Sequence, residues 1–136
     1  MAEFRHRERV RYSECDPQGV VFNARYLEYF DIGMTEIWRE TIGPYDTSMP
    51  EAGVDMVVAS ATIRYLASLR FDDEFEIAMT IKHMGTTSMI TAISIRRLDG
   101  AVCAEGEIRH VVVEHGTATK TPIPEEIRAA LQPYAV

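Results

Sequence analysis

Hydrophobic and polar residues alternate one by one at the start of the chain. Phe4, Val10 and Tyr12 fall on one parity of residues 4–12. The other parity carries four arginines: Arg5, Arg7, Arg9 and Arg11. A period of two is the pattern of a strand with one face in water, and a row of arginines on such a face is more typical of a protected edge than of a phosphate site. We therefore predict a first strand over residues 4–12.

The period then changes to that of a helix. Apolar residues recur at helical spacing after a polar loop: Tyr26, Phe30, Met34, Ile37 and Trp38. Asn23 is a favoured N-cap, so we predict a helix over residues 24–41, which Gly43-Pro44 ends. Gly33 has no side chain in the middle of this helix, which indicates that another segment packs closely there. The apolar stripe is wide, so we expect protein to surround most of this helix.

Four more strands are predicted after the helix. Residues 45–53 are rich in turn formers and predict a connecting loop. Residues 54–66 are β-branched and aromatic, and their apolar first half predicts a strand buried on both faces. Alternation predicts the remaining three strands, over residues 75–84, 89–95 and 102–114, with Asp99-Gly100 as a hairpin turn.

Two details complete the predicted fold. In the last strand, Ile108, His110 and Val112 share the parity that should point inward. Pro124 suits the first position of a short terminal helix, because Glu125 and Glu126 follow it at the positive end of the helix dipole. The order of one strand, a long helix and a four-strand meander predicts a single α+β domain over residues 1–136, in which a curved five-stranded antiparallel sheet wraps the long helix. Because one sheet covers only part of so apolar a helix, we also expect a second subunit to cover the rest, and therefore a homo-oligomer.

Composition and charge narrow the possible functions. The net charge is −7 and basic residues are scattered, which argues against nucleic-acid or acidic-membrane partners. No apolar run reaches the roughly 18 residues of a membrane span, and the charged N-terminus has no apolar leader segment. Cys15 and Cys103 lack a CxxC spacing and suit a reducing compartment. We therefore expect a cytoplasmic protein.

The loop over residues 13–22 contains the candidate chemistry. Asp16 precedes Pro17, and on the loop alone such an aspartate is more often a turn former than a catalytic group. Cys15 has no histidine placed by sequence to activate it, so we interpret it as a small buried hydrophobe. The four histidines form no metal-ligand motif and are interpreted as hydrogen-bonded structural residues: His6, His83, His110 and His115.

Several stretches together carry a family resemblance. They are DPQGVVFNARY at residues 16–26 with the helix after it, Tyr65-Leu66 followed by FDDE at 71–74, and IPEE at 123–126. In these the chain resembles, over nearly its whole length, the hotdog-fold acyl-CoA thioesterases of the 4-hydroxybenzoyl-CoA thioesterase and YbgC-like type. The resemblance implies a hotdog fold, a site formed where protomers meet, Asp16 as the catalytic carboxylate and the backbone N–H of Asn23 as the group that polarises the thioester carbonyl.

That chemistry agrees with these residue types. Thioester hydrolysis develops negative charge on the carbonyl oxygen, and each N–H donor at a helix N-terminus stabilises it by roughly 3 kcal/mol. A carboxylate such as Asp16 can attack the carbonyl carbon or take a proton from water. Gly19 permits positive φ or a close backbone approach, and we expect Tyr26 beside the substrate.

The expected substrate is an acyl-CoA, with an acyl carrier protein thioester as the alternative. YbgC-like relatives usually have His where this chain has Asn23, and members closer to the 4-hydroxybenzoyl type carry basic residues for the CoA phosphates where this chain has Gly85-Thr86-Thr87. The nearest basic alternatives are Lys82, Arg96 and Arg97. We expect a homodimer or homotetramer, no metal and no cofactor besides the CoA of the substrate. The alternative function is a noncatalytic hotdog protein that binds acyl-CoA or acyl carrier protein.

Overall fold

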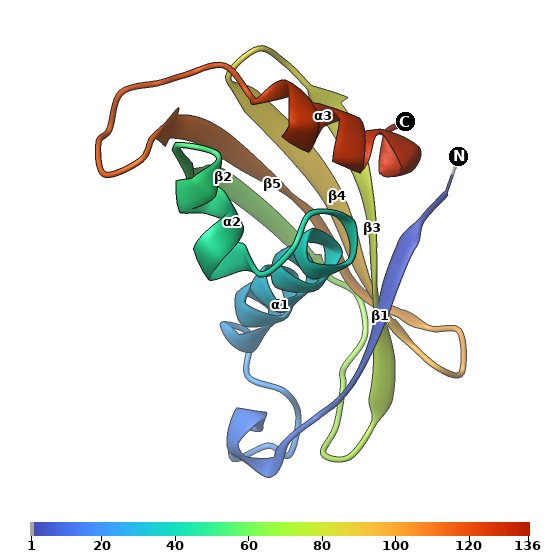
Figure 1. Cartoon of the computed structure of the whole chain (residues 1–136). Coiled ribbons are helices and arrows are strands. Elements are labelled where there is room, and N and C mark those ends of the chain that lie inside the picture. Colours follow the sequence, from blue (N-terminus) through green and yellow to red (C-terminus); the bar gives the residue numbers. More distant parts are fainter. Residues whose placement is uncertain (1) are drawn as a thin grey trace.

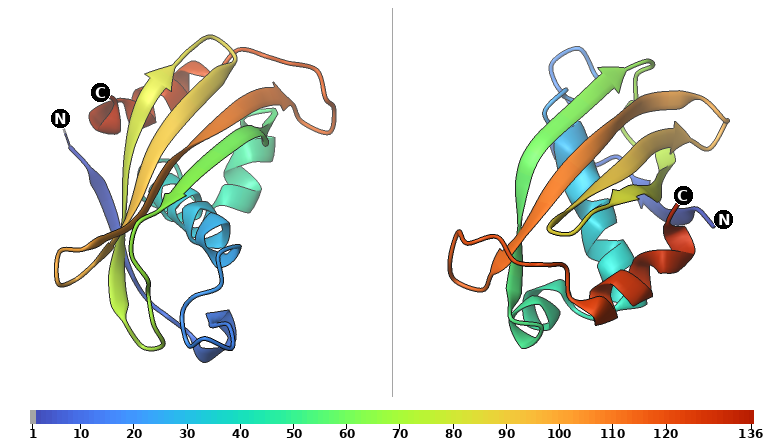
Figure 2. Two further views of the ribbon diagram at one scale, coloured as in Figure 1. Left: turned by 180° about the vertical axis from the view of Figure 1, so that it is seen from behind. Right: turned by 90° about the horizontal axis from the view of Figure 1, so that it is seen from above.

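One curved antiparallel sheet holds one long helix against its concave face in the computed structural model, which describes residues 2–136 (Figure 1). The elements are β1 (Phe4–Arg9), α1 (Arg25–Thr41), α2 (Tyr45–Glu51), β2 (Val54–Tyr65), β3 (Glu74–Met84), β4 (Ser88–Arg97), β5 (Val102–Glu114) and α3 (Glu125–Leu131), with short 3-10 turns at Tyr12–Glu14 and Gln132–Tyr134. The strands lie in the order β1-β3-β4-β5-β2. Figure 2 shows from two further sides that the sheet curves around α1.

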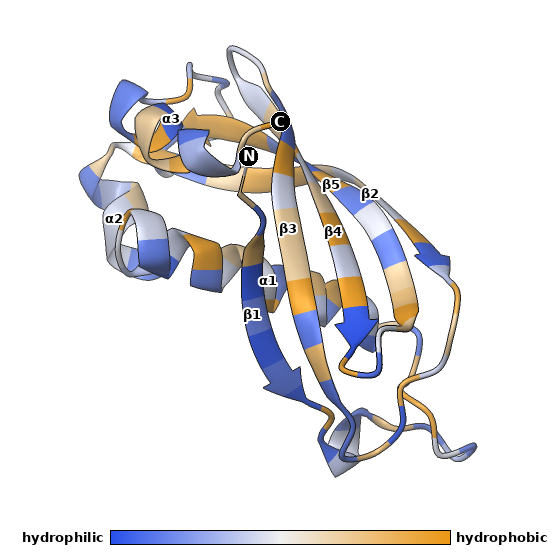
Figure 3. Ribbon diagram, turned by 90° about the vertical axis from the view of Figure 1, so that its right-hand side faces the viewer, coloured by the Kyte–Doolittle hydropathy of each residue, from blue (hydrophilic) through white to orange (hydrophobic). Residues whose placement is uncertain are grey.

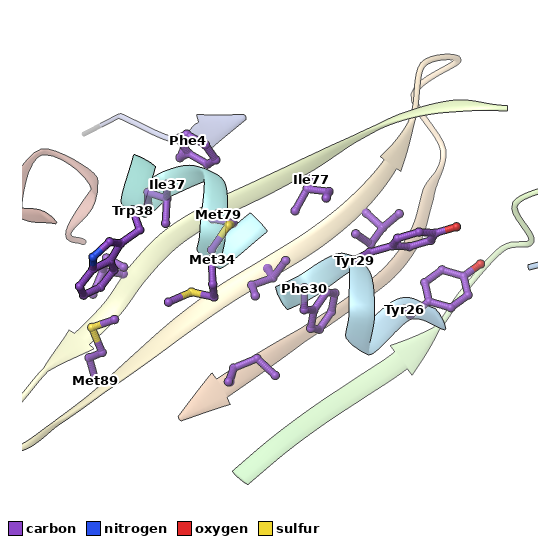
Figure 4. Close-up of a cluster of buried hydrophobic side chains, with 14 of the residues drawn as sticks. Phe4, Tyr26, Tyr29, Phe30, Met34, Ile37, Trp38, Ile77, Met79 and Met89 are labelled. Atoms are coloured by element: carbon purple, nitrogen blue, oxygen red, sulfur yellow. The ribbon is translucent and has the colours of Figure 1, made fainter. Parts of the chain in front are cut away.

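The core lies between α1 and the concave face of the sheet. Figure 4 shows Phe30 and Met34 pointing from α1 toward the strands, with Tyr26 and Trp38 near opposite ends of the helix. Gly33 allows the closest approach: a Cβ there would lie 2.6 Å from Met79 Sδ and 2.8 Å from Ile77 Cγ2. The close packing predicted at Gly33 is confirmed.

The first strand and the helix both differ from prediction at their ends. β1 ends at Arg9, and residues 12–14 form a 3-10 turn instead of continuing the strand. α1 begins at Arg25, and Ala24 rather than Asn23 occupies the N-cap position, without a side-chain cap. The reason is a turn closed by the Arg25 N–H on the carbonyl of Phe22 at 2.9 Å, which places Asn23 before the helix.

Two predictions about the next segment are wrong. Residues 45–53 contain a helix, α2, because Met49 is buried and the indole N–H of Trp38 donates to Ser48 Oγ at 2.8 Å. β2 is an exposed edge strand rather than a strand buried on both faces, since within residues 2–136 it pairs only with β5. The meander therefore contains three strands, β3, β4 and β5, instead of the predicted four. Residues 66–73 connect β2 to β3 across the end of the sheet.

Other expectations agree with the structure. The outward face of β1 is strongly hydrophilic (Figure 3), and Arg9 pairs with Asp72 and Glu74. β5 has the predicted bounds, and Ile108, His110 and Val112 are buried on its inner face. The hairpin around Asp99-Gly100 is present, although its connection spans residues 98–101.

The terminal helix is also present. It begins at Glu125, one residue later than predicted, because Pro124 is the N-cap rather than the first helical residue. Its inner residues Ile127 and Leu131 are buried, and Arg128 donates to the carbonyls of Met84 and Gly85. α3 therefore closes the end of the sheet at the β3–β4 turn.

Candidate functional site

Residues 15–21 fold back on themselves as a small hairpin. Cys15 and Val21 pair as an antiparallel bridge, the Asp16 N–H donates to the carbonyl of Val20 at 2.8 Å, and the Gly19 N–H donates to the carbonyl of Asp16 at 2.9 Å. Gly19 has a φ of +80°, which residues with a Cβ rarely adopt. Gly19 therefore serves the tight turn that returns the chain toward α1.

The carboxylate of Asp16 is half-buried in this hairpin. Its Oδ1 accepts a hydrogen bond from the Gln18 N–H at 2.8 Å, and Oδ2 accepts none from residues 2–136. Glu14 differs, because its Oε1 accepts from both the Arg11 N–H at 2.7 Å and the Tyr29 hydroxyl at 2.9 Å. Each acid thus keeps one oxygen without a hydrogen bond within residues 2–136, but of the two only Asp16 lines the groove described below.

The start of α1 offers unpaired donors. The N–H groups of Asn23 and Ala24 donate to no acceptor within the described part of the chain, whereas the next N–H, that of Arg25, is already bonded. The carbonyl of Asn23 accepts from the Tyr65 hydroxyl at 3.1 Å, which ties this turn to the end of β2. Two free N–H groups at the positive end of a helix dipole favour a negatively charged or polarised oxygen.

A groove of about 480 Å³ joins these two features. It is lined by Asp16, Val20, Val21, Phe22, Asn23, Tyr26, Tyr65, Leu66, Ala67 and Ser68. The structure therefore places Asp16, Asn23 and Tyr26 along one groove, and all three lie in the stretch 16–26 that carries the family resemblance. Gly19 shapes the hairpin without lining the groove. The far wall, residues 65–68, carries no chemical motif, and its only signal in the sequence was the Tyr65-Leu66 pair.

Aromatic rings fix the floor of the groove. Tyr26 packs edge-to-face against Tyr65 and Tyr29, with ring centroids 5.4 and 5.8 Å apart. Burial raises the pKa of Tyr26, and burial together with the bond to Glu14 raises the pKa of Tyr29. Both phenols therefore stay protonated at neutral pH and act as walls and donors rather than as bases.

The three basic residues proposed for the CoA phosphates lie in different places. Lys82 pairs with Glu107, and Arg96 pairs with Glu3, both away from the groove of Asp16. Arg97 does not line the groove either: its Nη1 donates to the carbonyl of Ser68 at 3.0 Å, and its guanidinium pairs with Asp99.

Cys15 and two of the four histidines have ordinary surroundings. Burial raises the pKa of the Cys15 thiol, which disfavours a nucleophilic thiolate. His6 bonds Glu8 and His115 bonds Asp55, as expected for structural residues.

His110 corrects the interpretation of the histidines. It is buried, and its Nδ1 has no hydrogen-bond partner in residues 2–136. The sequence pattern predicted that His110 points inward, but it gave no sign that Nδ1 would lack a hydrogen-bond partner. The presence of a partner depends on which side chains face His110 across the core.

Comparison with known proteins gives a consistent result. A family model described as the thioesterase-like superfamily matches residues 10–131. The acyl-CoA thioester hydrolase YbgC of Escherichia coli is 31% identical over 126 residues, which cover 93% of this chain and 93% of the relative. The acyl-CoA thioesterase YbgC of Haemophilus influenzae is 25% identical over 122 residues, covering 90% of this chain and 89% of the relative.

Solved structures agree with the fold. A crystal structure of a hypothetical protein from Aquifex aeolicus superposes with a TM-score of 0.86 at 27% identity, covering 94% of this chain and 98% of that one. A 1,4-dihydroxy-2-naphthoyl-CoA thioesterase from Synechocystis superposes with a TM-score of 0.88 at 16% identity, covering 96% of each chain. None of the helices within residues 2–136 is long and apolar enough to cross a membrane.

Proposed function

This chain belongs to the thioesterase-like superfamily and has the hotdog fold, and we propose that it hydrolyses the thioester bond of an acyl-CoA. The observation that carries the proposal is the groove that both Asp16, with its open oxygen, and Asn23, with its free N–H group, line at the start of α1. The names of the YbgC relatives, which are acyl-CoA thioester hydrolases, support the substrate class.

The geometry supports separate roles for the N–H groups at the start of α1 and for Asp16. A thioester carbonyl oxygen placed at the start of α1 would accept from the free N–H groups, and each donor would stabilise the developing charge by roughly 3 kcal/mol. Asp16 would then act on the carbonyl carbon from within the same groove. As a nucleophile its oxygen forms an anhydride while the CoA thiolate leaves, and water then cleaves the anhydride. As a general base it removes a proton from water, which attacks the carbon while the thiolate leaves.

Release of the CoA thiol across a panel of acyl-CoAs tests this function. The panel should vary chain length and include aromatic acyl groups, with an acyl carrier protein thioester as the second carrier. Hydrolysis of at least one acyl-CoA at a rate well above the uncatalysed one is the expected result. Binding without hydrolysis across the panel would establish the noncatalytic alternative, with which the Gln18 bond is equally compatible, since a purely structural Asp16 makes that same bond.

We also propose that a second copy of the chain covers the β2 edge. β2 pairs with β5 on one side only, and its apolar Val57 and Val58 are 47% and 57% exposed. An edge strand with exposed apolar residues is ready to pair with another chain. Light scattering should therefore report a multiple of the 15.4 kDa chain mass.

Charged substitutions locate that interface. Val57→Lys should shift the mass toward the monomer, because a charge on the edge blocks pairing. Leu98→Lys, at an exposed apolar residue between β4 and β5, is the matched control and should leave the mass unchanged. A monomeric wild-type protein, or equal effects of the two variants, would contradict this interface.

A further inference from the structure

Two buried polar atoms beneath α1 lack partners. Within residues 2–136, Thr91 Oγ1 and His110 Nδ1 are buried without a hydrogen bond. Thr91 of β4 pairs with Ile108 of β5, and Met89 pairs with His110, so Thr91 and His110 are diagonal neighbours on the inner face of the sheet. Buried polar groups in proteins nearly always have a partner. This patch therefore lacks a hydrogen-bonding group that the chain itself does not supply.

A hollow of about 270 Å³ opens beside His110. It lies between α1, β2 and β5, and its apolar walls are Leu27, Phe30, Met34, Val58 and Ile108. Its other lining residues are Glu28, Asp31 and His110. Figure 4 shows Phe30 and Met34 on the side of α1 that faces the strands. An apolar hollow with few polar groups is the usual form of a small-molecule site.

The charge state of His110 selects the kind of group that fits. Burial lowers the pKa of His110, so at neutral pH the ring is neutral and offers one donor and one acceptor. A hydroxyl can both accept and donate, and it matches such a ring. Asp31 and Glu28, both exposed at the rim, would repel a carboxylate, and they would hold an ammonium at the rim rather than at the neutral ring, so a hydroxyl fits His110 better than either charged group.

The hollow and the proposed reaction site lie along the same helix, α1. Residues 27, 31 and 34 of α1 follow one face of the helix, at spacings that bring their side chains to the same side. The helical rise from Arg25, the first residue of α1, to Asp31 is about 9 Å. β2 flanks both places, with Tyr65 at the groove and Val58 at the hollow. An acyl chain that starts at the helix N-terminus and follows α1 would reach His110 at its far end.

We propose that this hollow binds the far end of the acyl group and that His110 recognises a hydroxyl there, which makes ω-hydroxyacyl thioesters the favoured substrates. The proposal rests on acyl-CoA as the substrate of the Asp16 groove. It does not depend on whether Asp16 acts as a nucleophile or as a general base.

Matched pairs of substrates test the proposal. We would compare kcat/KM for ω-hydroxyacyl-CoAs and plain acyl-CoAs of six, eight and ten carbons. One hydrogen bond to the buried ring of His110 is expected to favour the hydroxylated partner about tenfold at one of these lengths. His110→Leu should lose that preference, and His110→Gln should keep part of it, because an amide also offers a donor and an acceptor.

A binding measurement separates this proposal from the proposed hydrolysis. Calorimetry with the corresponding CoA thioethers, which cannot be hydrolysed, should show the same tenfold preference in Kd. A preference in binding without turnover would refute the thioesterase proposal and leave the role of His110 standing. Turnover with equal values for hydroxylated and plain chains at all three lengths would overturn the role of His110, as would an unchanged preference in His110→Leu. The comparison of hydroxylated and plain chains on the wild-type protein is decisive by itself. The proposal can therefore be refuted even if a His110 variant folds poorly.

Discussion

Replacing Gly33 by alanine tests how closely α1 sits on the sheet. In an exposed helix, Gly→Ala stabilises by about 1 kcal/mol. At Gly33 the new Cβ would lie 2.6 Å from Met79 Sδ and 2.8 Å from Ile77 Cγ2, well inside the ~3.5–4.0 Å of a good contact. Met79 is flexible and can move, but the Ile77 methyl belongs to a stiff β-branched side chain. Such overpacking costs about 1–3 kcal/mol, so we expect a net loss of about 1 kcal/mol.

Urea unfolding with matched controls measures this loss. Gly33→Ala should lower the midpoint at an unchanged m value, and Gly33→Val should lower it further. Thr35→Ala on the same helix is half-buried without such a contact and should be neutral or slightly stabilising. A Gly33→Ala protein more stable than wild type would refute the close packing. Because α1 also positions Asn23, the same variant should lower kcat, and a shift of about 1 Å at a reacting group can cost about 100-fold.

Two further predictions concern single residues of the helix start and the core. Asn23→Ala should change the free energy of unfolding by less than about 0.5 kcal/mol in urea titrations, because the Asn23 side chain caps nothing, whereas loss of a working N-cap costs about 1 kcal/mol. Burial lowers the pKa of His110, so the unfolded chain binds the proton more tightly, and wild-type stability should fall as the pH drops below about 6.5. Asp31 and Glu28 line the hollow beside that ring, and His110→Leu should lack this part of the loss in urea midpoints measured between pH 7.5 and 5.5.

The sequence predicted those features that depend on local pattern. The bounds of β5, its inward Ile108 and Val112, and the small residue at Gly33 follow from periodicity and side-chain size, and the structure confirms them. The pairing of Asp16 with the start of α1 followed from the family resemblance, and the shared groove is consistent with it.

The features that the sequence missed depend on tertiary contacts. α2 contains Pro50 and turn-forming residues, and contacts such as Trp38 to Ser48 hold it as a helix. The apolar pattern of β2 suggested burial, but the pattern does not reveal that only β5 lies beside it. The unpartnered His110 is invisible in the sequence because it results from what the opposing elements fail to offer.

A comparison of kcat between two single variants, Asp16→Asn and Glu14→Gln, tests the proposed role of Asp16 most directly. Asparagine keeps an oxygen that can accept from the Gln18 N–H, so the hairpin should remain folded while the reacting carboxylate is lost. Glu14→Gln removes a charge two residues away, from a side chain already bonded to Arg11 and Tyr29. On the best acyl-CoA of the panel, Asp16→Asn should lose at least ~100-fold in kcat, and Glu14→Gln should lose less than ~10-fold. Near-normal turnover in Asp16→Asn would contradict the assignment of Asp16 as the reacting carboxylate.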